Sequence, residues 1–581
     1  MNDASGNLVA PTTKIVVANS GLLDGGVVLH NNTLNLNGTA GRITGAVTGD
    51  PGSTVNVNGT FTTEDTFSVD AFTIASGGVF NMAHGVTAAS GVSNGGTLSV
   101  AAGDTVTITG DYTQTAGGIF QTGAASLASY GKLVVTGTAN LSASNTVDVK
   151  VSAGDTLANG NVLTSVLSAG TLTAGALTVT DNSAMWNFTG TVNGNAIDLT
   201  TEQALTFADA VSSGAVSPAA AGVAGALDVI QDAGATGDMQ TVLNALGALA
   251  TEGEVAAAVT QLMPGFAGGG AQVAMGLASS GGSQVVHERM SGGRHGLSSG
   301  DPLFKDRMVW AQPFYSWTDQ NERKGVAGYR ADSYGVALGA DGKVNEQWRA
   351  GAALSLAKGD VDGDSPVTRN NLTIDTYQVN LYATGQLSEA TSLNLQAGLG
   401  INDNDSSRHI VFGGLNRIAS GDYMSWHTLL DAELEHGYKV SEKAALASYL
   451  RAQYTYVNVE DYAETGAGAI NLHLDDNNED SLVVTVGGRV AYAVTDQVKL
   501  TGHLGAGYDL MASQSSVTAT FAGGGASFVT DGLDPSAFVM QGGLGFEMLN
   551  ANGLTVTARY DVDGREDYTN QTASIKFRLP F

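Results

Sequence analysis

The final stretch of the chain, Gln571–Phe581, alternates between apolar and polar side chains. Its apolar positions are Ala573, Ile575, Phe577, Leu579 and Phe581, and the intervening positions include Ser574, Lys576 and Arg578. Side chains alternate across a β-strand, so one face of this strand is apolar and the other is charged. In a soluble sandwich the charged face meets outside water. In a transmembrane barrel it lines a wet lumen and the apolar face meets lipid, and this reading is favoured because the pattern repeats over the preceding part of the chain.

The same stretch resembles the C-terminal signal of bacterial outer-membrane barrels, a strand that closes on a terminal Phe. The resemblance implies that Phe577, Leu579 and Phe581 form the signal read by the barrel-assembly machinery. It also implies that periplasmic chaperones and outer-membrane lipid are partners of the chain.

Composition excludes several other classes of protein. The chain of 581 residues has no run of eighteen or more apolar residues, so the sequence offers no transmembrane helix, and a barrel is the remaining way to span a bilayer. A net charge of −29 argues against nucleic acid as a partner. The absence of cysteine excludes disulfides and thiol catalysis. The start has no basic region followed by an apolar one, so we expect a mature form or an internal fragment whose upstream sequence was removed.

Residues 1–200 are predicted to form a parallel β-helix. Gly, Thr, Ala, Val, Asn and Ser dominate, and short alternating runs such as Thr54–Asn58, Phe72–Ala75 and Thr97–Val100 are each closed by Gly, Asn or Asp. The runs recur at roughly twenty residues without helical segments between them, which is typical of a solenoid whose rungs stack on one another. Met185–Phe188 and Asn195–Leu199 are expected to cap its last rung, with Trp186 covering the exposed edge.

Residues 205–300 are predicted to be an α-helical linker. Apolar residues recur there at intervals of three and four, as in Leu227 and Ile230, while Gly234, Gly237 and Gly253 divide the helix into short pieces. From Phe266 to Met290 small residues predominate, which is a weak choice for a free helix but suits a segment threaded through a narrow pore. A flexible tether of partial helicity is the alternative reading.

Residues 305–581 are predicted to form a 12-stranded antiparallel transmembrane β-barrel. Five short turns alternate with six longer polar connections, as in outer-membrane barrels with periplasmic turns and external loops. The short turns are expected near 345–346, 388–390, 440–442, 495–496 and 550–552, and the long connections near 318–330, 358–371, 404–420, 459–480, 511–535 and 563–569. Aromatic side chains near strand ends are expected to form interface girdles; they are Trp310, Trp317, Trp348, Trp426, Tyr454, Tyr456 and Tyr508.

Charged residues on the polar faces of these strands are predicted to line the lumen. Placing Asp431 or Glu433 in lipid would cost up to several kcal/mol each, which fixes the register of that strand. The residues predicted to face the lumen are His427, Asp431, Glu433, Glu435, Arg451, Lys576 and Arg578.

Several segments together resemble classical monomeric autotransporters, the type Va secretion family with AIDA- or pertactin-like passengers. They are Arg307–Trp317, Tyr334–Asp341, the linker around QLMPGFAGGGAQVAMG, Tyr112–Phe120 with Tyr130–Leu141, and the final strand. The resemblance covers roughly 205–581 strongly and 1–200 loosely. It implies an all-β fold with a β-helical passenger, a short helical linker whose last helix enters the pore, and a translocator barrel in the bacterial outer membrane.

No catalytic constellation is recognisable. Gly363–Pro366 lacks the final glycine of the GDSG motif of serine-protease passengers, and it lies in a predicted barrel loop. His30 and His84 lack partners at metal-ligand spacing. We therefore expect no enzyme activity, no cofactor and no metal. No Asn occurs between Asn244 and Asn321, so cleavage after an asparagine inside the pore is not expected, and passenger and barrel are predicted to stay covalently joined.

The sequence therefore predicts a monomeric outer-membrane protein that translocates and displays its own β-helical passenger on the cell surface. The predicted role is adhesion to a host cell or matrix, or autoaggregation. Two alternatives stay open at this point: an enzymatic passenger domain encoded upstream, and an outer-membrane channel.

Overall fold

The computed structural model describes residues 16–152, 157–213, 216–268, 283–291, 307–549 and 554–580. Its contacts divide the chain into two compact units. The first comprises residues 1–210, 235–255 and 412–414, and the second comprises residues 211–234, 256–411 and 415–581. The predicted linker is thus shared between the units, and each unit is described by itself.

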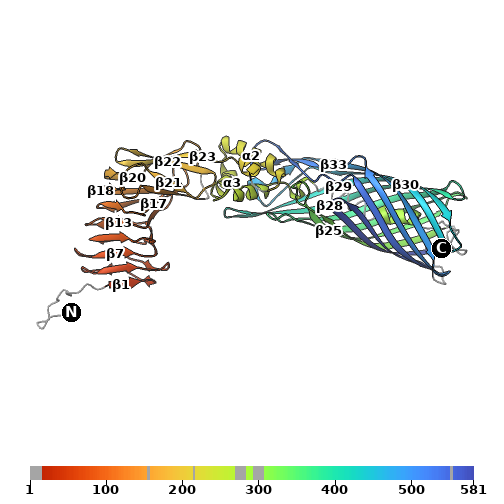
Figure 1. Cartoon of the computed structure of the whole chain (residues 1–581), viewed down its shortest axis with the longest axis horizontal. Coiled ribbons are helices and arrows are strands. Elements are labelled where there is room, and N and C mark those ends of the chain that lie inside the picture. The colour runs from red at the N-terminus through yellow and green to blue at the C-terminus, as the bar shows by residue number, and fades with distance from the viewer. Residues whose placement is uncertain are drawn as a thin grey trace, which may run out of the picture. The chain divides into compact units, whose positions relative to one another are not determined.

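The first unit is a parallel β-solenoid, as predicted (Figure 1). Leu34 pairs with Val55, Val55 with Phe72, and Phe72 with Val92, so each rung lies on the rung before it. Its strands are β1 (Val16–Asn19), β2 (Leu22–Leu23), β3 (Val27–Val28), β4 (Thr33–Leu36), β5 (Arg42–Ile43), β6 (Val47–Thr48), β7 (Thr54–Val57), β8 (Thr60–Thr62), β9 (Phe67–Val69), β10 (Ala71–Ile74), β11 (Val79–Asn81), β12 (Val86–Ala88), β13 (Val92–Asn94), β14 (Thr97–Val100), β15 (Thr105–Thr109), β16 (Tyr112–Gln114), β17 (Ile119–Ala124), β18 (Lys132–Asn140), β19 (Thr146–Val151), β20 (Val162–Thr173) and β21 (Thr178–Asp181).

The solenoid core is apolar because every second side chain of a rung points inward. Phe61 and Phe80 from successive rungs stack with their ring centroids 6.4 Å apart. Phe67 meets Phe61 edge-on at 6.0 Å, and Phe72 lies 4.8 Å from Phe80. Offset and edge-to-face aromatic contacts of this kind add to the gain from burial.

The segment expected to cap the solenoid forms an antiparallel hairpin of β22 (Trp186–Asn193) and β23 (Ala196–Gln203). Gly194, at φ +59°, makes its turn. β23 also pairs antiparallel with β20, so the parallel ladder ends there. Within this unit the hairpin is covered by α3 (Gly237–Gly247): the Ser183 hydroxyl donates a hydrogen bond to the Gly247 carbonyl at 2.5 Å, and Trp186 is buried.

The second unit is a closed antiparallel barrel of twelve strands, which confirms the predicted strand number (Figure 1). β39 closes the barrel on β24, where Tyr568 lies opposite Gln320. The strands are β24 (Arg307–Gln320), β25 (Tyr329–Lys343), β26 (Trp348–Gly363), β27 (Asn370–Gln386), β28 (Thr391–Phe412), β29 (Leu415–Lys439), β30 (Ala444–Val459), β33 (Asn477–Ala493), β34 (Val498–Asp509), β37 (Phe538–Leu549), β38 (Thr555–Arg565) and β39 (Tyr568–Pro580).

Two of the six long connections were predicted wrongly. The stretch 404–420 is mostly strand, because β28 and β29 continue to a tight turn at Gly413 and Gly414, both with positive φ. The stretch 563–569 is likewise reduced to the pair Glu566 and Asp567 between β38 and β39. Both stretches are polar because these strands extend past the apolar band of the wall. The prediction interpreted this polarity as a sign of a loop.

Two genuinely long connections fold into a small antiparallel sheet of their own. It consists of β31 (Tyr462–Ala463), β32 (Leu472–Leu474), β35 (Ser516–Phe521) and β36 (Phe528–Asp531). We call it the loop sheet. The described helical segments besides α3 are α1 (Phe207–Ser213), η1 (Pro218–Ala220), α2 (Ala221–Asp232), α4 (Glu252–Thr260), η2 (Gly265–Gly268), α6 (Gln284–Ser291) and η5 (Gly468–Ile470). No helix among the described residues is long and apolar enough to cross a bilayer.

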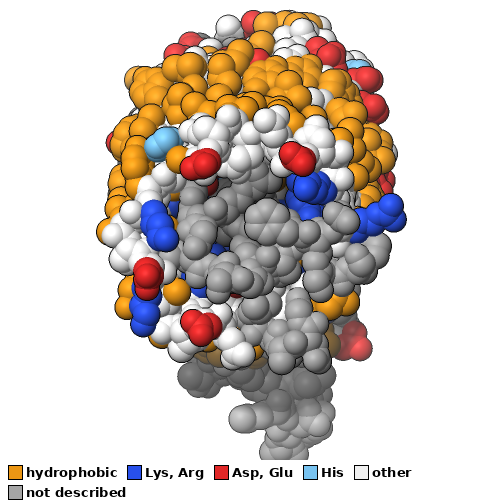
Figure 2. Space-filling view, turned by 90° about the vertical axis from the view of Figure 1, so that its right-hand side faces the viewer, with side chains coloured by type: hydrophobic (Ala, Val, Ile, Leu, Met, Phe, Trp, Pro, Cys, Tyr) orange, Lys and Arg blue, Asp and Glu red, His pale blue; other side chains and the backbone are white. Residues whose placement is uncertain are grey.

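The barrel wall is apolar outside and polar inside. On β29, Trp426, Leu430 and Leu434 are exposed on the outer face. The alternate residues His427, Leu429, Asp431 and Glu433 point inward and are buried. Figure 2 shows apolar side chains gathered on the outer surface, with charged side chains around the end of the barrel. Of the predicted girdle aromatics, Trp426 and Tyr508 lie on the outer face, but Trp310 is buried inside, so that prediction was wrong for Trp310.

Candidate functional site

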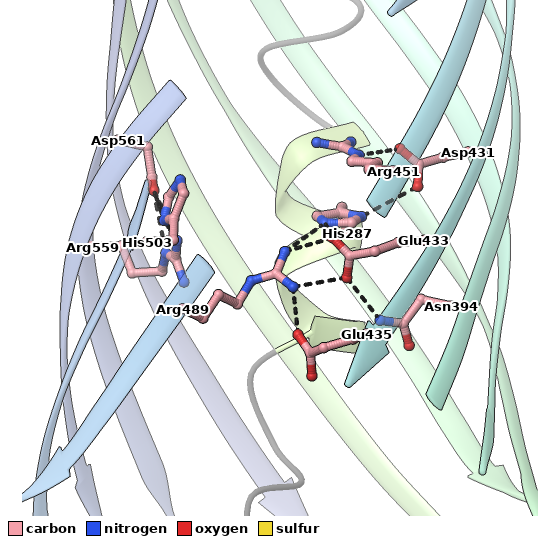
Figure 3. Close-up of polar contacts among 10 residues, drawn as sticks. All are labelled: His287, Asn394, Asp431, Glu433, Glu435, Arg451, Arg489, His503, Arg559 and Asp561. Carbon is pink, nitrogen blue, oxygen red and sulfur yellow. Dashed lines mark hydrogen bonds and ion pairs between the residues drawn. The ribbon is translucent and has the colours of Figure 1, made fainter. Parts of the chain in front are cut away.

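Helix α6, formed by Gln284–Ser291, lies inside the barrel and is the candidate functional element (Figure 3). At its start, the Ser283 hydroxyl accepts a hydrogen bond from the Gln378 side chain of β27 at 2.8 Å. The helix belongs to the segment predicted to enter the pore. The part of that segment at 269–282 lies outside the described residues.

One side of α6 packs on an apolar part of the inner wall. Val285, Val286 and Met290 are buried against side chains of β24 to β27. The wall residues of this cluster are Trp310, Phe314, Ala337, Ala353 and Tyr382. The contact removes apolar surface from the wet lumen, which stabilises the helix where it lies.

The aromatic residues of that wall lie flat over glycines. A Cβ added to Gly339 would lie 2.4 Å from the Trp310 ring, and one added to Gly351 would lie 2.5 Å from the Tyr382 ring. The Trp310 indole donates a hydrogen bond to the Tyr382 hydroxyl at 2.7 Å. The inward-facing glycines thus leave room for large side chains within a narrow lumen.

The other side of α6 meets charged groups of β29 (Figure 3). His287 lies between two carboxylates: its Nδ1 is 3.4 Å from Asp431, and its Nε2 is 3.2 Å from Glu433. Arg489 donates to both oxygens of Glu433, at 2.9 and 2.6 Å, and also bonds to Glu435. Arg451 donates to Asp431 at 2.6 Å. The carboxylates lie on β29, and the two arginines lie on β30 and β33, so the network joins the helix to three consecutive strands of the wall.

The next two helix residues pair in other directions. Glu288 accepts a hydrogen bond from Gln312 at 3.0 Å and lies 3.4 Å from Arg559. Arg289 donates two hydrogen bonds to Asp341, each of 2.9 Å. Three consecutive side chains of α6 are therefore held by polar contacts to β29, β38 and β25, and those of Glu288 and Arg289 are ion pairs. A buried pair is costly to break because one charge is left uncompensated.

The predicted lumen-facing residues all lie inside the wall. Asp431, Glu433, Glu435 and Arg451 belong to the network around His287, whereas His427 bonds to Asn402 at 3.4 Å. Lys576 and Arg578 line a cavity beside Glu288 and Arg289. Of the predicted C-terminal signal, Phe577 and Leu579 point outward and are exposed, and Phe581 lies outside the described residues.

Sequence reasoning missed the apolar wall and the partners of the helix. One available signal was that Tyr382 shares the polar face of its strand with Gln378 and Asn380, which places an aromatic side chain on the inner face of the wall. The charged run His287–Arg289 after a stretch of small residues was a second signal. Neither signal identifies Asp341, Arg489 or Arg559 as partners of the helix, because these residues lie far from the helix in the sequence.

Comparisons with known proteins agree with this geometry. Residues 309–561 match the family described as Autotransporter beta-domain. Outer membrane protein B of Rickettsia prowazekii is 26% identical over 200 residues, which is 34% of this chain and 12% of that protein. Esterase EstA of Pseudomonas aeruginosa is 23% identical over 268 residues, covering 45% of this chain and 41% of the esterase. The chain thus spans only a small part of the length of the rickettsial relatives that it matches.

Among solved structures, the translocator domain of the autotransporter NalP from Neisseria meningitidis is similar, at 19% identity and a TM-score of 0.42. The likeness covers 52% of this chain and 98% of that domain. Residues 309–561, which match the family, include the apolar wall and the carboxylates that hold α6, and they form most of the closed barrel. The C-terminal part of the chain is therefore an autotransporter beta-domain, which forms a closed barrel in the outer membrane.

Proposed function

We propose that the barrel translocates the chain's own β-helical passenger and displays it on the cell surface, after which α6 remains in the lumen as a plug. The observation that supports this proposal is the two-sided fixation of α6, by apolar packing on β24–β27 and by polar contacts of His287, Glu288 and Arg289 with charged groups of the wall. A segment left in the pore at the end of export would be held by such contacts.

The proposed role of the passenger is adhesion to a cell or matrix, or association with its own kind. Polar side chains of successive rungs form ladders on its surface: Asn56 donates to Asn35 at 2.8 Å, and Asn58 donates to Asn37 at 3.0 Å. On another face Ser99 donates to Gln121, which in turn donates to Asp148, each at 2.8 Å. Such repeated polar surfaces suit many weak contacts with a partner, and the proposal involves no catalytic step.

Protease treatment of intact cells tests display. The full chain is expressed behind a signal peptide, and protease is added from outside. The expected result is loss of residues 1–200 while residues 301–581 stay protected in the outer membrane. Without protease, a single band of full length is expected, because passenger and barrel are proposed to remain joined. A passenger that resists protease on intact cells but is digested after lysis would overturn the display proposal.

Planar-bilayer recording tests the plug. The full chain is expected to give low conductance, and a chain lacking residues 205–300 is expected to give large, steady openings. Equal and high conductance of both proteins would contradict plugging and would support a channel.

A further inference from the structure

A second attachment of the linker involves Arg408, near the end of β28. Its side chain is among the largest that are fully buried, with 1% of the residue exposed. It forms a two-point ion pair with Glu464 of the connection that contains β31, at 3.2 and 2.6 Å. The same guanidinium donates to two backbone carbonyls, those of Ile470 at 3.0 Å and Gln261 at 2.9 Å.

Gln261 belongs to the linker and directly follows the last residue of α4. The carbonyls at the end of a helix lack partners within the helix, and the helix dipole makes this end negative. A buried guanidinium is a fitting partner for such a carbonyl. The Gln261 side chain makes a second bond, because its Oε1 accepts a hydrogen bond from the Val411 backbone at 2.7 Å. Two atoms of one linker residue are therefore held by one strand end of the barrel.

Glu464 is held from a second direction as well. Besides Arg408, its carboxylate accepts a hydrogen bond from the Leu472 backbone, at the start of β32, at 2.8 Å. Leu472 pairs with Phe521 in β35. The ion pair thus connects the barrel wall to the loop sheet, and the Gln261 carbonyl completes the partners of Arg408.

The loop sheet contacts the linker at other points too. Helix α2 packs on β36, and a Cβ added to Gly222 would lie 2.0 Å from the Val529 carbonyl oxygen. Only glycine allows so close an approach of a helix to a strand. Gly525, between β35 and β36, lies beside the Ile230 side chain of α2, which would be 2.7 Å from an added Cβ. These contacts and the Arg408 pair lie on the same unit of the chain.

We propose that Arg408, Glu464 and the loop sheet form a docking site for the linker, and that the site is completed when the Gln261 carbonyl binds Arg408. The occupant is the chain's own segment Ala256–Gly268. Docking fixes the linker outside the lumen independently of α6. It also couples the folding of two loops to the arrival of the linker, because an arginine buried this deeply needs each of its acceptors. The proposal does not depend on what the passenger binds.

Cysteine labelling of the purified full chain in detergent tests the site, and the natural sequence contains no cysteine. Ala258 in α4 is 1% exposed, so a cysteine at this position, Ala258→Cys, reports whether the linker is docked. A hydrophilic maleimide is expected to label this cysteine slowly in the otherwise unchanged protein. With Arg408→Ala added, labelling is expected to be at least about tenfold faster, because docking no longer limits local opening.

Three controls make the result specific. Arg323→Ala removes another arginine of the loops, one that donates to the Asp534 carbonyl and pairs with Asp567, and it should leave labelling of Ala258→Cys unchanged. Asp461→Cys, an exposed site, should be labelled at one rate in every background. Retained heat-modifiable migration on gels establishes that the barrel is folded.

Glu464→Gln keeps a neutral acceptor for Arg408, so it provides a milder test if Arg408→Ala fails to fold. Intermediate acceleration of labelling is expected. Slow labelling in a folded Arg408→Ala protein, or in Glu464→Gln where Arg408→Ala does not fold, would overturn the docking site and leave Arg408 a stabiliser of the loops alone. Failure of the surface-display experiment would not produce this result, because labelling is measured on isolated protein.

Discussion

The solenoid and the barrel use the same alternation of side chains with opposite outcomes. In β7 and β10 of the solenoid, the buried positions are apolar and the outward positions are Thr, Asn and Ala. In β29 of the barrel, the buried positions include Asp431 and Glu433, and the outward positions include Trp426, Leu430 and Leu434. The period of two specifies a strand, but the medium on each side of the sheet decides which residues belong there. The comparison teaches that polarity alone does not tell inside from outside.

The first and largest effect is expected in the solenoid core. Phe80→Ala should destabilise the passenger by about 3–5 kcal/mol, because Phe80 contacts Phe61, Phe67 and Phe72 and the cavity cannot be filled by lipid or water. Proteolysis of the full chain in a urea series should show the passenger band lost at lower urea, while the barrel band is unchanged. Equal loss of both bands would contradict separate stabilisation of the two regions.

The second effect concerns the charged core of the barrel. Glu433→Ala should cost about 3–5 kcal/mol, because it leaves the buried Arg489 and His287 without their shared carboxylate. The expected outcome is release of α6, seen as higher conductance in bilayers at an unchanged amount of inserted barrel. Glu433→Gln keeps hydrogen-bonding atoms in the same place and should open the pore less. An unchanged conductance in Glu433→Ala would mean that apolar packing alone holds the helix.

The alternation made much of the fold predictable from the sequence. The strand number could be read from the alternation of short and long connections. The inward placement of Asp431 and Glu433 could be read from β29 itself, because a charge in lipid is so costly that only one register is possible. The solenoid rungs were readable for a similar reason, since each short strand repeats the pattern of the one before it.

The exceptions lie where another segment changes the medium. Trp310 was expected at the membrane interface, yet it faces inward because Val286 and Met290 of α6 create an apolar surface inside the lumen. Arg408 gave no signal of its own either, since its acceptors at Gln261 and Glu464 lie in distant segments. A strand pattern reports the average surroundings of a strand, and such contacts depend on a partner that the pattern does not contain.

The third effect compares the outer faces directly. Leu430→Lys on the barrel should cost about 2–4 kcal/mol, because it places a charge on the exposed apolar outer face of the wall, which meets lipid. The matched change Val79→Lys on an outward position of β11 should cost about 0.5 kcal/mol or less, since that face meets water. Barrel unfolding in detergent–lipid mixtures measures the first change, and proteolysis in urea measures the second. Similar costs at the two sites would refute the assignment of lipid to one face and water to the other.

The smallest effect tests how the lumen makes room for α6. Gly339→Ala should cost about 1–3 kcal/mol, because the new methyl group would overlap the Trp310 ring, and that ring packs against the helix. Gly488→Ala is the matched control, since the nearest atom to its added Cβ is the Ala447 carbonyl oxygen at an ordinary 3.6 Å. Thermal unfolding of the barrel should shift downward for the first variant and stay unchanged for the second. If the Trp310 ring shifts to make room for the new methyl group, it moves toward Val286 and disturbs the packing of α6. Gly339→Ala should therefore also raise conductance slightly. Loss of stability without any change in conductance would show that the aromatic wall supports the barrel but does not hold the plug.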